Sequence, residues 1–85
     1  SNQKGMIFML KILLIPNTDR FLEKVNSCSG DVVLHLPDQS TCSLKNDRIA
    51  AQMLRMMDVN KNGLTLSLTN PSDYSIMLDY MVNAA

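Results

Sequence analysis

The sequence has no tryptophan, and its only aromatic residues are two tyrosines and two phenylalanines. These four residues follow no spacing that would stack successive bases, so a site for single-stranded nucleic acid is not predicted. The eight basic and eight acidic residues give a net charge of zero. The chain therefore has no overall electrostatic attraction for nucleic acid or for an anionic membrane, and we expect neither as a partner.

Cysteine and histidine are also scarce. Cys28 and Cys42 are too few for a four-ligand zinc site, and His35, the single histidine, lacks nearby residues that would complete a metal site or a catalytic triad. Two reduced thiols of an intracellular protein are expected, with a disulfide between them as the alternative. We expect no catalytic residue, no metal and no cofactor.

One stretch partly matches a calcium-binding loop. Asp58-x-Asn60-x-Asn62-Gly63 has the opening spacing of an EF-hand, whose twelfth position should be a bidentate glutamate. That position is Thr69, inside a segment with alternating leucines. The stretch is therefore interpreted as a turn between a helix and a strand.

No apolar run is long enough to cross a bilayer. Residues 6–15 form the longest one, interrupted by Lys11, whereas a spanning helix needs about 20 residues. A signal peptide is not expected either, because no small-residue cleavage site follows the run. We interpret the run as a strand of a cytoplasmic protein. Residues 1–85 are predicted to form one domain, with 1–5 as a tag remnant or a disordered lead-in.

The chain is organised around residues 31–46, which are predicted to form a β-hairpin. Val32, Leu34 and Leu36 alternate with Val33 and His35, so the first strand has an apolar face and a mixed outer face that includes His35. Residues 37–40, Pro-Asp-Gln-Ser, supply the turn.

Capping signals and apolar periodicity predict the other elements. Helices are expected at 18–27, from 46 or 47 to about 58, and from the Asn-Pro-Ser-Asp start at 70–73 to the C-terminus. Gly30 is expected to follow the first of these helices as its C′ glycine. Leucines alternate in a strand at 64–69. The predicted apolar stripes of the three helices are Phe21, Leu22, Val25 and Cys28; Ile49, Ala50, Met53, Met56 and Met57; and Tyr74, Met77, Leu78, Met81 and Val82.

The element order is strand, helix, strand, strand, helix, strand, helix. It predicts an α+β fold with the helices on one side of an antiparallel sheet. Residues 11–84 resemble HPr, the histidine-containing phosphocarrier protein of the bacterial sugar phosphotransferase system. The best stretches are Gly-Asp-Val-Val-Leu at 30–34, Cys-Ser-Leu-Lys at 42–45 and Gly-Leu-Thr-Leu-Ser-Leu at 63–68. The resemblance implies an open-faced sandwich with strand order 1-4-2-3 and three helices on one face.

Both phosphorylation sites of that family are missing. HPr carries phosphate on a histidine at the start of its first helix, where this chain has Asn17, Thr18 and Asp19. The aspartate would repel a phosphate, so we expect no phosphate or sulfate on the backbone amides of residues 18–21. The regulatory serine that many HPr proteins carry at their second helix is replaced by Asn46.

The sequence therefore favours an HPr-like domain that acts as a binding or regulatory module through contacts with an unknown protein, without chemistry of its own. One alternative is a working phosphocarrier that uses an unrecognised residue such as His35. Another is a purely structural domain of a larger assembly.

Self-association is also predicted, through the first strand. The odd-numbered residues of this strand would place apolar side chains on the open face of the sheet next to its edge, where a second copy could pair and form a homodimer. The residues concerned are Ile7, Met9, Leu13 and Ile15.

Overall fold

The chain is described by a computed structural model that covers residues 9–13, 15–57 and 63–83. The elements in order are β1 (Met9–Ile12), α1 (Thr18–Ser27), β2 (Val32–His35), β3 (Thr41–Ser43), α2 (Arg48–Met56), β4 (Leu64–Leu68), the 3-10 turn η2 (Pro71–Asp73) and α4 (Tyr74–Asn83). Of the predicted turn at 58–63 only Gly63 is described, and its φ of +75° is the left-handed conformation that favours glycine. Residues 58–62 lie outside the described residues, as do residues 6–8 and 14 of the predicted first strand.

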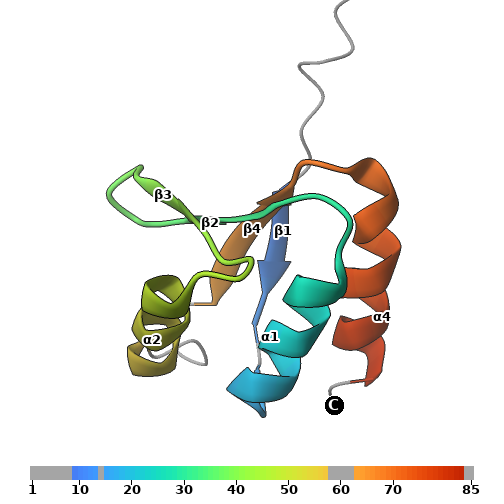
Figure 1. The fold of residues 1–85 in the computed structure, drawn as a ribbon, viewed down its shortest axis with the longest axis horizontal. Helices are drawn as coiled ribbons and strands as arrows, with labels where there is room; N and C mark the ends of the chain where they lie inside the picture. The colour runs from blue at the N-terminus through green and yellow to red at the C-terminus, as the bar shows by residue number, and fades with distance from the viewer. Residues whose placement is uncertain (1–8, 14, 58–62, 84–85) are drawn as a thin grey trace, which may run out of the picture.

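The four strands form one antiparallel sheet in the order β1-β4-β2-β3, with helices α1, α2 and α4 on one face (Figure 1). This confirms the predicted fold class and strand order. Leu66 lies at the centre of the sheet, opposite Leu10 of β1 and Leu34 of β2, and its side chain is completely buried. The even-numbered strand residues therefore face the helices, as the alternation predicts.

Each helix begins at a side-chain cap. The Asn17 side chain accepts a hydrogen bond from the amide of Arg20, so α1 has the bounds that the sequence predicted. Asp47 caps α2, and Asn70 caps η2, which leads into α4. These caps satisfy amides that lack a partner within the helix, which is why local sequence places helix starts well.

Gly30 has a different role from the predicted one. Helix α1 ends at Cys28 in an extended conformation, and Gly30 is not among the residues with positive φ, so the prediction of a C′ glycine is wrong. A Cβ atom at Gly30 would lie 2.6 Å from Thr69 Oγ1 and 2.9 Å from Asn70 Cβ. Glycine is needed here because the segment that joins β4 to η2 passes too close for a side chain.

The inward faces of α2 and α4 also differ from the predicted stripes. In α2 the buried residues are Ala50 and Leu54, whereas Ile49 and Met56 point to solvent. In α4 the buried residues are Met77 and Tyr80, whereas Leu78 and Val82 are exposed. Apolar residues occupy more than one side of each helix, so periodicity alone does not select the side that packs on the sheet.

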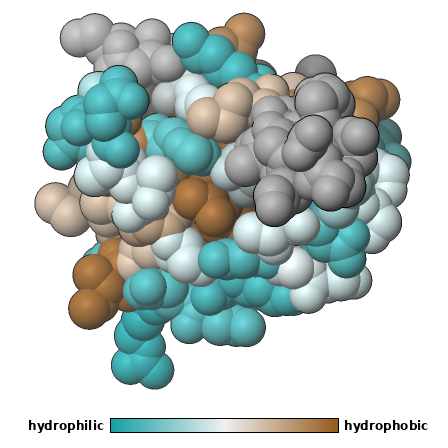
Figure 2. All heavy atoms as spheres, turned by 90° about the horizontal axis from the view of Figure 1, so that it is seen from above, coloured by the Kyte–Doolittle hydropathy of each residue, from teal (hydrophilic) through white to brown (hydrophobic). Residues whose placement is uncertain are grey.

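The core lies between the sheet and the helices. Phe21 of α1 is fully buried and contacts the Tyr80 ring edge-on, with centroids 5.5 Å apart and an interplanar angle of 60°. Figure 2 shows one face of the molecule. Where grey atoms do not cover this face, hydrophobic residues form separate groups with hydrophilic residues between them.

Candidate functional site

The start of α1 corresponds to the phosphohistidine position of the HPr resemblance. Asn17 Oδ1 accepts from the Arg20 amide at 3.1 Å, and the Asn17 carbonyl accepts from the Phe21 amide at 3.1 Å. The Asp19 carboxylate pairs with Arg55 Nη2 of α2 at 2.6 Å, while Thr18 is half-buried. The helix start therefore has a side-chain cap and a negative charge beside it; that it binds no phosphate remains a prediction.

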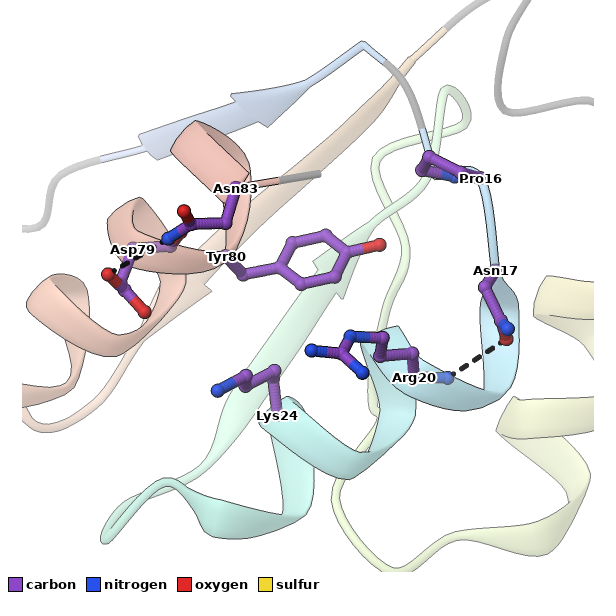
Figure 3. A pocket seen from close by; sticks show the side chains of 7 residues that line it. All are labelled: Pro16, Asn17, Arg20, Lys24, Asp79, Tyr80 and Asn83. Carbon is purple, nitrogen blue, oxygen red and sulfur yellow. Dashed lines mark hydrogen bonds between the residues drawn. The ribbon is translucent and has the colours of Figure 1, made fainter. Parts of the chain in front are cut away.

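A cavity of about 220 Å³ opens beside this helix start, between α1 and α4 (Figure 3). The α1 side contributes Arg20 and Lys24, whose side chains extend toward α4. The α4 side contributes Tyr80, with its ring against Phe21. The complete lining is Pro16, Asn17, Arg20, Lys24, Asp79, Tyr80 and Asn83.

The polar groups of this cavity differ in whether they have a hydrogen-bond partner within the described residues. Asn83 Nδ2 donates to the backbone carbonyl of Asp79 at 2.8 Å and to its carboxylate at 3.2 Å. Burial raises the pKa of the Tyr80 hydroxyl, although the Arg20 charge opposes this effect. The hydroxyl is therefore a hydrogen-bond donor at neutral pH.

Asn46, at the family's phosphoserine position, lies just before the α2 cap. Its φ is +55°, a left-handed conformation that asparagine tolerates better than most residues, and its amide donates to Asn26 Oδ1 at 2.9 Å. Its side chain has no hydroxyl to receive a phosphoryl group. The left-handed backbone conformation at this position favours asparagine over most other residues.

His35, the alternative phosphoacceptor, lies on the outer face of the sheet. Its Nε2 is 2.7 Å from Ser67 Oγ, and both residues are at least partly buried. The register places His35 between Thr41 of β3 and Thr65 of β4. It is therefore separated from the α1 start by the thickness of the sheet, and one ring nitrogen already has a partner.

The predicted self-association residues divide into three groups. Met9 and Leu13 are 56% and 67% exposed, as the prediction requires. Ile15 is only 8% exposed and belongs to the core, so its place in the exposed row is wrong: β1 ends at Ile12, and strand alternation no longer holds beyond it. Ile7 lies outside the described residues.

Sequence reasoning missed an exposed apolar patch on α2. Ile49 is 82% and Met56 is 85% exposed, and they stand two helical turns apart with the exposed Gln52 between them. We call Ile49, Gln52 and Met56 the α2 patch. The signal was the surplus of apolar residues on a short helix, which the sequence interpretation assigned entirely to the core.

The two cysteines and the acidic residues of the described ranges form no metal-binding cluster or disulfide. Cys28 and Cys42 are both free thiols, and burial raises the pKa of each. In the part of the chain that the structure describes, no three histidine, cysteine, aspartate or glutamate residues are grouped as metal ligands. None of the described helices is both long and apolar enough to cross a membrane.

Comparison of the chain with protein-family models, with curated proteins and with solved structures finds no match. The fold is therefore known from the structure, and none of these comparisons identifies a family for the chain.

Proposed function

We propose that this chain is an HPr-like domain of the bacterial cytoplasm that acts as a non-catalytic binding or regulatory module through contacts with another protein. Two features support a role without phosphate transfer. Asn17 and Asp19 stand where the family has its phosphohistidine site, and Asn46 stands at the phosphoserine position. The strand order 1-4-2-3 is consistent with the family's architecture.

The observation that carries the proposal is the α2 patch. Large apolar side chains with more than four-fifths of their surface exposed gain free energy when a partner covers them. Two such side chains on one helix face, with a glutamine between them, form a mixed surface of the kind that a protein partner can cover. The helix is held in place by Ala50 and Leu54, so the patch is presented on a rigid element.

Site-specific photo-crosslinking in the source organism tests the patch. A crosslinker at Ile49 or Met56 should capture one discrete protein, whereas a crosslinker at Asp38, in the exposed hairpin turn, should not. With that partner purified, Ile49→Glu combined with Met56→Glu should weaken binding at least tenfold because the charges would be desolvated at the interface. Val82→Glu, at a side chain of α4 that is 78% exposed, is the matched control. If the crosslinkers at Ile49, Met56 and Asp38 all capture the same set of proteins, the α2 patch is rejected as an interface.

Phosphotransfer separates the proposal from the working-phosphocarrier alternative. The protein is incubated with phosphoenolpyruvate and the phosphotransferase enzyme I, and an acid-labile label is sought. We expect none, because the described α1 start offers an amide cap in place of an imidazole. A label that disappears in His35→Gln would establish the alternative and reject the binding-module proposal.

We also propose a homodimer formed through β1. Among the described residues β1 pairs only with β4, so its other edge offers backbone groups to a second copy. Met9 and Leu13 provide exposed apolar surface beside that edge. Two-fold symmetry would make antiparallel pairing of two β1 strands self-complementary.

Sedimentation at micromolar concentration should show a dimer for the unmodified protein and a monomer for Met9→Lys, which places a charge in the interface. Met56→Lys, at a methionine of α2 that is more exposed than Met9 (85% against 56%), should leave the dimer intact. A monomer for the unmodified protein would contradict the self-association proposal and leave the α2 patch unaffected.

A further inference from the structure

The cavity between α1 and α4 contains two cationic side chains without counterions. Arg20 and Lys24 are four residues apart on α1, so they lie on the same side of the helix, and both line the cavity (Figure 3). Like charges at this spacing repel each other. Within the described residues the only ion pair joins Arg55 to Asp19, so neither cavity cation forms an ion pair with an acidic side chain.

A second observation comes from the opposite wall. The Tyr80 residue is only 5% exposed, but its hydroxyl, which has no partner among the described groups, is not buried, because no buried polar side-chain atom of those residues lacks a hydrogen bond. The ring is held by its edge-on contact with Phe21, and it directs the hydroxyl into the cavity beside Arg20 (Figure 3). The cavity therefore combines a solvent-facing hydroxyl on a fixed ring with two positive charges that form no ion pair among the described residues.

We propose that this cavity binds the carboxylate of a small organic acid. A guanidinium group matches a carboxylate geometrically and can bond both of its oxygens, so Arg20 would be the main contact. Tyr80 would donate a further hydrogen bond, and Lys24 would add positive charge. Pro16 and the Tyr80 ring give the cavity an apolar portion that suits the carbon skeleton of the acid.

Charge and size restrict the ligand further. Asp79 also lines the cavity, and the Asn83 amide holds its carboxylate in position. This fixed negative charge favours a monoanion over a dianion such as phosphate. A volume of about 220 Å³ is below the range of roughly 300–1,000 Å³ that is typical of drug-sized ligands. The Arg20 amide is not part of the site, because it already donates to Asn17 Oδ1.

Titration of the full chain with sodium benzoate, followed by ¹⁵N–¹H spectra at constant ionic strength, tests the proposal. Saturable shifts are expected at Arg20, Lys24 and Tyr80. Arg20→Gln should weaken binding at least tenfold, and Tyr80→Phe, which keeps the ring contact with Phe21, should weaken it several-fold. Arg48→Gln, an exposed arginine on α2, is the matched control and should leave the affinity unchanged.

Inorganic phosphate under the same conditions should bind at least tenfold more weakly than benzoate. Equal affinity for the two anions, shifts that do not saturate, or an equal loss in Arg48→Gln would each overturn the proposal. The site is independent of the α2 patch, so failure of either experiment leaves the other conclusion intact.

Discussion

Replacing Leu66 with alanine should reduce the free energy of unfolding by about 2–5 kcal/mol. Leu66 has no exposed surface and lies in the central pair of strands, with Leu10 on one side and Leu34 on the other. The truncation removes apolar contacts and leaves a cavity that the sheet cannot close, because hydrogen bonds fix β4 to both neighbouring strands. For a domain of 85 residues this is a large part of a total stability of roughly 5–15 kcal/mol.

Urea unfolding followed by circular dichroism measures this loss. Leu78→Ala is the matched control, since the same change at a side chain that is 48% exposed and lies outside the proposed dimer surface should cost well under about 2 kcal/mol. If Leu66→Ala also costs less than about 0.5 kcal/mol, the side chain does not fill the core and the strand faces are assigned backwards.

Replacing Asp73 with asparagine should cost about 2–4 kcal/mol, because charged hydrogen bonds are lost and a partly buried backbone amide loses its partner. Asp73 is 1% exposed, and its two carboxylate oxygens accept from the amides of Ser29 at 2.9 Å and Gly30 at 2.8 Å. These bonds tie η2 to the segment between α1 and β2. Asparagine offers one acceptor oxygen, so its NH₂ group would face the second backbone donor.

The same carboxylate should make stability depend on pH. The hydrogen bond from Gly30 and then that from Ser29 lower the pKa of Asp73, and the charge of Lys45 acts in the same direction. Its contribution is therefore fully present above the unfolded-state pKa of about 3.9, and it is lost as the pH falls through the lower folded value.

Urea unfolding of the unmodified protein and of Asp73→Asn at pH 7 and at pH 3 checks both effects. The difference between them should be largest at pH 7 and should shrink at pH 3. Asp79→Asn, at an exposed position of α4, is the control and should stay within about 0.5 kcal/mol of the unmodified protein. A difference that is constant between the two pH values would contradict the proposed role of the Asp73 charge.

Local signals in the sequence determined the elements and the architecture. Pro16 and Asn17 define the start of α1, and alternating leucines define β4, because capping and strand alternation act over only a few residues. With the elements in order, the connections and the resemblance to HPr restricted the sheet to the observed order 1-4-2-3.

Tertiary structure decided which side chains are buried and which groups they contact. Asp73 has the position of a helix-start acid, yet its carboxylate bonds amides that are more than forty residues away in the chain. Tyr80 packs on Phe21, whereas the sequence interpretation placed Leu78 and Val82 in the core. Residues such as Asp73 and Tyr80 find their partners only when distant segments meet, and no periodicity within one helix carries that information.

The exposed surfaces were the hardest to predict for the same physical reason. Ile49 and Met56 are apolar and helical, so sequence alone assigned them to the core, but the short α2 buries only the side that meets the sheet. The α1–α4 cavity likewise exists only because two helices from opposite ends of the chain lie side by side (Figure 1). Its arginine and tyrosine are unremarkable in sequence, and tertiary packing alone makes them neighbours.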